Sequence, residues 1–288
     1  MTTTLHDSPN LTNDNTQIDF IDQVPVIAHG DSWFSLGALL GPRAGNMLQY
    51  LSFPNATALV SYAAPKLKLV DMVQHNKLFI NAMTTRGMPV WRAILISGGG
   101  NDLFEALKAN PAHDLNERLL RTQNEWTDAP DASRYLSDEG WKTLTNQLMT
   151  AYLGLDALRR VSVSPDAPIV THVYDYATPR PAGLVFGLFD AWLSAPLQHY
   201  GIPSDDWIPV VHVLLDRFHQ FLLADVMARI SNFHVIDTSG TLTPATIHEA
   251  GRTVHWANEI HPNPDGYEVL ANQVVNPYLT NLLTRTNT

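Results

Sequence analysis

The chain has no cysteine among its 288 residues, which excludes disulfides and thiolate chemistry. Charged residues are also sparse, at 16%, and the 18 basic side chains are outnumbered by 28 acidic ones, so the formal net charge is −10. A chain with this balance lacks the basic surface that neutralises phosphates, which argues against nucleic acid as a partner. No run approaches the roughly 18 consecutive apolar residues of a membrane-spanning helix, and we expect no transmembrane segment.

The N-terminus lacks the pattern of a secretory signal. Its first ten residues have no cationic region followed by an apolar run, and we therefore expect a cytoplasmic protein. We expect residues 1–22 to be a flexible segment. Residues 23–288 are expected to form a single domain, because α/β chains of this length often fold as one unit.

Short apolar runs alternate with longer segments of helical periodicity along the chain. The predicted strands are residues 24–28, 58–63, 93–97, 169–174 and 233–236. The predicted helices are residues 66–85, 141–160, 210–230 and 266–283. This alternation predicts an α/β fold of three layers, α/β/α, with a mostly parallel five-stranded sheet that binds ligands at the carboxyl ends of its strands.

Two stretches interrupt the alternation. Residues 103–139 are mixed and polar, and we expect a surface excursion there. Residues 177–209 are rich in proline and large apolar side chains, including the run Leu-Val-Phe-Gly-Leu-Phe at 184–189. This second insertion is either a cap that contacts an apolar part of a substrate or a segment that packs on the core or on another subunit.

Three polar motifs lie at the ends of predicted strands or before the last helix. Ser32 lies in Gly-Asp-Ser-Trp, Asn101 in Gly-Gly-Gly-Asn-Asp, and His261 in Asn-Glu-Ile-His-Pro. A serine hydroxyl is a weak nucleophile, so it needs a base within hydrogen-bond reach and donors aimed at the oxyanion. His261 is the candidate base, because an imidazole titrates near neutral pH. The backbone N–H of Ser32 and the side-chain amide of Asn101 are the candidate donors.

Each motif also has an ordinary structural interpretation. Asp31 and Ser32 fit a helix N-cap, the glycine-rich run fits a turn, and His261 is one of 12 histidines in the chain. All three motifs nevertheless occur in one chain at the positions where a site should assemble, and this joint occurrence favours catalysis.

The motifs resemble those of the SGNH, or GDSL, hydrolases over the stretch from Gly30 to His261. The resemblance implies that Ser32 is the nucleophile, that Asn101 helps to hold the oxyanion, and that His261 is the general base. It also implies the chemistry of an esterase or lipase, in which Ser32 receives the acyl group of an ester.

One departure from the family pattern concerns the residue that orients the base. Asn258 stands three positions before His261, where the family has an aspartate. An asparagine oxygen can accept from the imidazole and hold its tautomer, but it cannot stabilise the imidazolium with a negative charge. Asp237, after the last predicted strand, is an alternative acid, whereas Glu259 is expected to point away from the imidazole.

A second departure follows the predicted strand at 58–63, where the family has a glycine whose N–H faces the oxyanion. Ala64 and Lys66 are candidate donors in its place, and Pro65 has no N–H to give. We expect four residues beside the catalytic ones to contact the substrate: Asp31, Trp33, Gly100 and Ala64.

The segment at the end of the fourth strand carries His172 and Asp175, which either line the site or are a buried histidine and a turn aspartate. No spacing of histidines and carboxylates indicates a metal site, so we predict no metal and no cofactor. The sequence therefore predicts a serine-dependent carboxylic ester hydrolase for a small ester with an apolar group. The alternative is a binding protein of the same fold with little catalysis, which Asn258 and the missing glycine favour.

Overall fold

A parallel sheet forms the centre of the protein. The computed structural model describes residues 2–12, 18, 20–35, 45–182 and 191–285, and within them the strand order is β1-β3-β2-β4-β5-β6, with all neighbours parallel. The strands are β1 (Thr3–Asp7), β2 (Val24–Gly30), β3 (Thr57–Ser61), β4 (Ile94–Ser97), β5 (Ile169–His172) and β6 (Phe233–Ile236). Runs such as Val26, Ile27 and Ala28 are fully buried, because helices cover both faces of the sheet.

The predicted three-layer α/β/α fold with a mostly parallel sheet is confirmed, with one strand more than expected. That strand is β1, which pairs with β3 at the edge of the sheet and places Leu5 opposite Leu59. The expectation of a flexible segment over residues 1–22 is therefore wrong for Thr3–Asp7. The run Thr-Thr-Leu-His-Asp has a weak pattern of its own, and its extended form depends on pairing with β3.

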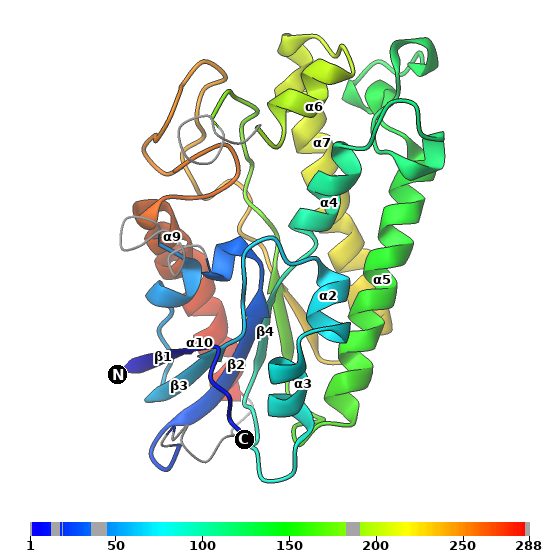
Figure 1. Cartoon of the computed structure of the whole chain (residues 1–288). Coiled ribbons are helices and arrows are strands. Elements are labelled where there is room, and N and C mark those ends of the chain that lie inside the picture. Colours follow the sequence, from blue (N-terminus) through cyan, green and yellow to red (C-terminus); the bar gives the residue numbers. More distant parts are fainter. Residues whose placement is uncertain (1, 13–17, 19, 36–44, 183–190, 286–288) are drawn as a thin grey trace.

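The helices form two layers (Figure 1). On one face of the sheet lie α2 (Leu69–Gln74), α3 (Lys77–Thr84), α4 (Gly100–Leu107), α5 (Asp138–Arg160), α7 (Trp207–Gln220), the π-helical η6 (Phe221–Val226) and α8 (Met227–Arg229). On the other face lie η1 (Met47–Tyr50), α9 (Pro264–Leu270), the π-helical η7 (Ala271–Val275) and α10 (Asn276–Arg285). Shorter elements lie in the connections: η2 (Leu115–Glu117), η3 (Gln123–Glu125), η4 (Ala132–Tyr135), α6 (Ser194–His199) and η5 (Ser204–Asp206).

The predicted helices are found with shifted bounds. The segment 66–85 divides into α2 and α3, because Asn76 starts a new helix by accepting a hydrogen bond from the Phe79 N–H at 3.1 Å. The last helix begins at Pro264, where Asn263 caps it through the Gly266 N–H. α4 and α6 were not predicted, because both are short and the first begins inside a glycine-rich run.

The strand order changes direction at β2, because β3 lies on one side of it and β4 on the other. The chain passes from β2 to β3 on one side and then returns to β4 on the other, so the carboxyl ends of β2 and β4 are neighbours. Gly30 lies opposite Ser97 there, and a Cβ on Gly30 would lie 2.8 Å from the Cβ of Ser97. Such a switch point is where open parallel sheets bind ligands. It brings the segments that follow Gly30 and Ser97 together.

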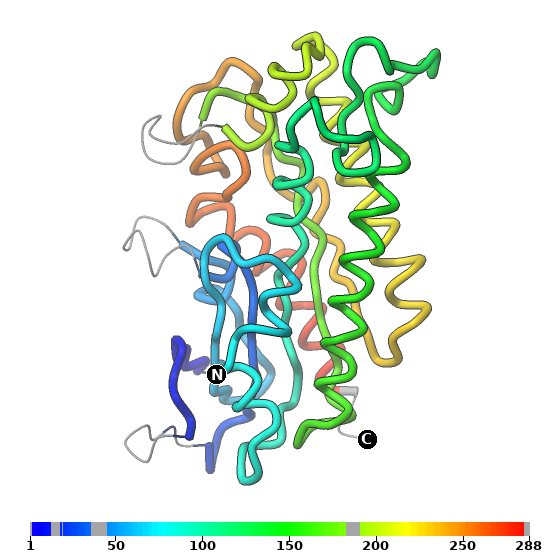
Figure 2. The backbone as a smooth tube through the Cα atoms, turned by 45° about the vertical axis from the view of Figure 1, so that its right-hand side comes forward, coloured from blue at the N-terminus to red at the C-terminus, as the bar shows by residue number. Residues whose placement is uncertain are grey.

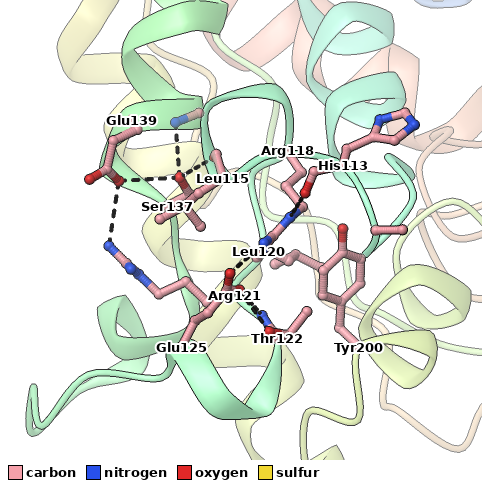
Figure 3. Close-up of polar contacts among 12 residues, drawn as sticks. His113, Leu115, Arg118, Leu120, Arg121, Thr122, Glu125, Ser137, Glu139 and Tyr200 are labelled. Atoms are coloured by element: carbon pink, nitrogen blue, oxygen red, sulfur yellow. Dashed lines mark hydrogen bonds and ion pairs between the residues drawn. The ribbon is translucent and has the colours of Figure 1, made fainter.

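The insertion at 103–139 is an ordered part of the fold. α4 runs into it as far as Leu107, and the remainder is organised around the buried guanidinium of Arg118 (Figure 3). Arg118 donates to the carbonyls of His113 and Leu120, at 2.9 and 2.7 Å, and to the carboxylate of Glu125 at 2.6 Å. The predicted surface excursion is therefore a compact loop with its own buried charge.

Long connections gather beyond the carboxyl ends of the strands, at the top of Figure 2. One of them contains the second insertion, 177–209, whose apolar run 184–189 lies outside the described residues. Glu259 ties its described ends together, because its carboxylate accepts from the backbone N–H groups of Arg180, Leu193 and Ser194 at 2.8–2.9 Å. Among the described residues, none of the helices combines the length and the apolar character needed to cross a membrane.

Candidate active site

Ser32 and His261 meet at the carboxyl end of the sheet. Ser32 begins a helical turn directly after β2, and the Oγ of Ser32 lies 2.7 Å from Nε2 of His261. Both side chains are buried. The backbone N–H of Ser32 belongs to the first turn of this helix, where amides have no acceptor within the helix. A hydroxyl hydrogen-bonded to an imidazole in this way can be activated as a nucleophile.

Asn258 orients the imidazole. Its Oδ1 accepts hydrogen bonds from the backbone N–H groups of Ile260 and His261, at 3.1 and 2.9 Å, and lies 2.9 Å from Nδ1 of His261. Because Oδ1 only accepts, Nδ1 of His261 carries a hydrogen and Nε2 faces Ser32 as an acceptor. Burial lowers the pKa of His261 to about 4, so at neutral pH the imidazole is uncharged and Nε2 is available to accept a proton.

Neither neighbouring acid takes the place of an aspartate at position 258. Asp237 is exposed and accepts from the N–H and the hydroxyl of Ser239, so the suggestion that it orients His261 is wrong. Glu259 points away from His261, as expected, toward Arg180 and Ser194. Among the described residues, the amide of Asn258 is thus the group that contacts Nδ1 of His261.

Asn101 lies in the first turn of α4, after the carboxyl end of β4. Its Nδ2 donates to the carbonyl oxygen of Leu67 at 2.9 Å. An amide nitrogen carries two hydrogens, so this contact fixes the side chain and leaves the second hydrogen for another acceptor. Gly99 makes the turn into α4 with φ +100°, a conformation that glycine adopts without strain.

Asp31, expected to contact a substrate, makes its hydrogen bonds within the protein. Its carboxylate accepts from the Trp33 N–H at 3.0 Å and from the hydroxyl of Tyr174 at 2.5 Å, and Oδ1 lies 2.8 Å from the hydroxyl oxygen of Ser97. The side chain is buried, and burial raises its pKa to about 6. Asp31 is therefore the N-cap of the turn that carries Ser32, embedded in the protein.

Gly100 and Ala64 are likewise occupied by contacts inside the protein. The Gly100 N–H donates to the Tyr174 hydroxyl at 3.2 Å, and the Ala64 N–H donates to the Gly30 carbonyl at 3.0 Å. Contact of Ala64 and Gly100 with a substrate stays a prediction, although their N–H groups already have acceptors inside the protein. Lys66 adopts φ +66°, a left-handed conformation that favours glycine.

Trp33 borders a small apolar cavity. Its indole Nε1 donates to the Ile260 carbonyl at 3.1 Å, and its ring stacks on His172 with the centroids 5.3 Å apart. The cavity has a volume of about 20 Å³ and lies between α4 and α7. Its lining includes Trp33, Leu103, Phe104, Leu214 and Ile260.

Comparison with known proteins finds similar structures but no similar sequence. No protein-family model and no curated protein matches the sequence. An extracellular lipase from Streptomyces rimosus aligns over 87% of this chain and 99% of its own, at 16% identity and a TM-score of 0.50. The chain has the SGNH-hydrolase fold. A phospholipase A1 from Streptomyces albidoflavus also aligns, over 87% of this chain and 99% of its own, at 14% identity and a TM-score of 0.42.

In this SGNH-hydrolase fold, Trp192 contacts His261, and no local sequence pattern predicts that contact. Trp192 lies in the second insertion, and its ring meets that of His261 edge to face with the centroids 5.4 Å apart. Lys108, the residue that follows α4, also contacts this indole, with Nζ 5.8 Å from the centroid of the Trp192 ring. Trp192 therefore flanks the imidazole from the insertion.

The segment after β5 resolves the alternatives left open for His172 and Asp175. Both are buried: His172 contacts Ser97, and Asp175 accepts from the N–H groups of Tyr176, Gly240 and Leu242. Asp175 also borders the small apolar cavity beside Trp33. Within the described part of the SGNH-hydrolase fold, there is also no group of three histidine and carboxylate side chains placed to hold a metal ion.

Proposed function

We propose that this protein is a serine-dependent carboxylic ester hydrolase. The observation that carries the proposal is the chain of contacts from Ser32 Oγ through His261 to Asn258, with lengths of 2.7 and 2.9 Å. The fold supports it, because the lipase from Streptomyces rimosus shares this architecture over 99% of its length.

The proposed reaction has two halves. Ser32 Oγ attacks the ester carbonyl carbon while its proton passes to Nε2 of His261, which then protonates the departing alcohol as the ester bond breaks. Water next attacks the acyl-Ser32 carbonyl, giving its proton to His261, and the acid leaves as Ser32 regains its proton. The Ser32 N–H and the second hydrogen of Asn101 Nδ2 are assigned to the oxyanion that forms in each half.

Asn258 gives this site a neutral orienting group. It holds the required tautomer of His261 through Oδ1, so geometry is preserved. It adds no negative charge to stabilise the imidazolium, and burial of His261 opposes that charge further. We therefore propose a slower catalyst than one with a carboxylate at this position.

The substrate is proposed to be a small ester with an apolar acyl or alcohol group. One observation supports an apolar group: the indole of Trp192 lies against the imidazole of His261. Aromatic and aliphatic walls with few polar groups are typical of sites for such ligands.

Hydrolysis of p-nitrophenyl esters of increasing acyl length tests the proposal. The unmodified protein should hydrolyse at least one of them, and Ser32→Ala should lose turnover by about 10⁴-fold or more. Ser52→Ala, which alters an exposed serine before β3, is the matched control and should keep full turnover. Equal turnover in the Ser32→Ala variant, or none in the unmodified protein across the series, would contradict the proposed function.

A further inference from the structure

A second serine–histidine–carboxylate set lies beneath the proposed site, inside the core. It joins the carboxyl ends of three neighbouring strands: Asp31 follows β2, Ser97 ends β4 and His172 ends β5. Ser97 Oγ lies 2.8 Å from Asp31 Oδ1 and 3.0 Å from His172 Nε2. All three residues are at most 3% exposed, so this set does not meet a substrate.

With Asp31 ionised and His172 neutral, these three side chains have one hydrogen too few to make a hydrogen bond at every contact between them. His172 Nδ1 lies 2.8 Å from the Val173 carbonyl oxygen, which only accepts, so Nδ1 carries a hydrogen. In a neutral imidazole, Nε2 is then an acceptor. The single hydroxyl hydrogen of Ser97 thus faces two acceptors, His172 Nε2 and an ionised Asp31 Oδ1. Every contact is satisfied only when the set holds one further proton.

Asp31 is the place for this proton. Burial raises the pKa of Asp31 to about 6, whereas burial lowers the pKa of His172 to about 4. With the proton on Asp31, every contact is a hydrogen bond. Asp31 Oδ1–H donates to Ser97, Ser97 Oγ–H donates to His172 Nε2, and His172 Nδ1–H donates to the Val173 carbonyl.

The groups around Asp31 agree with this assignment. Asp102 on α4 raises the pKa of Asp31 further by its charge, and the hydrogen bonds from Tyr174, Trp33 and Ser97 lower it. The charge of Asp31 acts in turn on the phenols of three tyrosines from different elements: Tyr152 on α5, Tyr174 after β5 and Tyr267 on α9. None of these neighbours is a cation.

The same set connects the two halves of the proposed active site. Asp31 Oδ2 accepts from the Tyr174 hydroxyl at 2.5 Å, and that hydroxyl accepts from the Gly100 N–H at 3.2 Å. Asp31 directly precedes Ser32, and Gly100 directly precedes Asn101. One continuous network therefore holds the nucleophile turn against the turn that carries the amide donor.

We infer that Asp31, Ser97, His172 and Tyr174 form a positioning network that holds one shared proton and keeps Ser32 and Asn101 in register. When the proton is lost, Ser97 donates to Asp31, and the lone pair of His172 Nε2 faces the Ser97 oxygen. The hydrogen bond that joins the end of β4 to the end of β5 is then lost. The inference of positioning rests on the proposed function, whereas the shared proton does not.

NMR of the protein labelled with ¹⁵N-histidine tests the shared proton without any substrate. His172, assigned by comparison with His172→Asn, should stay neutral with a hydrogen on Nδ1 between pH 5 and 8. Its Nε2 resonance should shift with an apparent pKa near 6, the value to which burial raises Asp31, and Asp31→Asn should abolish that shift. An Nε2 resonance that does not respond to pH, or one that reports protonation of His172 itself, would overturn the inference.

Turnover on the p-nitrophenyl ester series tests the positioning role. In the unmodified protein, kcat should fall about fivefold as the pH rises through the same step, the factor that corresponds to one buried hydrogen bond. Tyr174→Phe should lower kcat by about tenfold with KM unchanged, by loss of two hydrogen bonds. Tyr267→Phe is the matched control and should keep kcat, because the buried Tyr267 hydroxyl has no hydrogen-bond partner among the described residues.

The two measurements separate the possible failures. A pH-dependent Nε2 resonance of His172 in a protein that hydrolyses no ester supports the shared proton and contradicts the proposed function. Turnover that depends on Ser32 but is equal in Tyr174→Phe and Tyr267→Phe, with both variants folded by circular dichroism, overturns the positioning role.

Discussion

Asn258 presents its side-chain oxygen to Nδ1 of His261 at 2.9 Å, so an uncharged amide holds the imidazole in the tautomer that accepts from Ser32. The contact orients His261 as a general base, but it supplies no negative charge to stabilise the imidazolium. Position 258 is therefore where the account can be tested by adding a charge.

Asn258→Asp should raise kcat. A carboxylate beside an imidazole stabilises the imidazolium, with a pKa shift of about 1–3 units, and each unit corresponds to about tenfold. We expect a gain of about tenfold or more on the best p-nitrophenyl ester, measured at pH 7.5. Unchanged or lower turnover in a folded Asn258→Asp protein would show that the charge at this position does not limit the reaction.

The pH dependence of kcat/KM should reflect the burial of His261. Burial lowers the pKa of His261 to about 4, so the basic form that accepts the Ser32 proton is present above about pH 4 and lost below it. The acid limb of the profile should therefore lie near pH 4 and move upward in Asn258→Asp. An acid limb near 6.5, the pKa of an exposed histidine, would contradict this account.

Asn101→Ala should impair turnover without disturbing the fold. Removal of one oxyanion donor costs about 10²–10³ in kcat in a comparable hydrolase, and we expect a loss of that order. Asn146→Ala, on the exposed side of α5, is the matched control and should keep its turnover. Equal kcat in the two variants would assign the oxyanion to other donors.

Arg180 should support the site through the backbone of Asn258. Its fully buried guanidinium donates to the carbonyls of Glu249, Gly251 and Asn258 at 2.7–2.8 Å. A lysine cannot reach all three, and each unsatisfied buried carbonyl costs about 1–3 kcal/mol. Arg180→Lys should lower the free energy of unfolding by about 2 kcal/mol in urea titrations and reduce kcat, whereas the exposed Arg252→Lys should do neither.

The parts of this protein that could be predicted from sequence have strong local signals. The buried strands are continuous apolar runs, and Ser32, Asn101 and His261 stand in short motifs at strand ends. Parallel topology brings such ends together whatever the intervening sequence, so the Ser32–His261 contact could be anticipated across 229 positions.

The parts that could not be predicted depend on partners without a local pattern. Asp31 and Gly100 were expected to contact a substrate, and the hydroxyl of Tyr174, which follows β5, contacts the carboxylate of the first and the N–H of the second. Ala64 is occupied by the Gly30 carbonyl through sheet register, and β1 is a strand because β3 offers it an edge. Such contacts are set by tertiary packing, which the sequence of either partner alone does not reveal.

The most direct test of the central claim, that His261 activates Ser32, is covalent labelling with a fluorophosphonate followed by peptide mapping. At pH 7.5 the unmodified protein should carry one adduct on Ser32, His261→Ala should label far more slowly, and Ser32→Ala should not label. An adduct on another residue, or equal labelling rates with and without His261, would contradict the account.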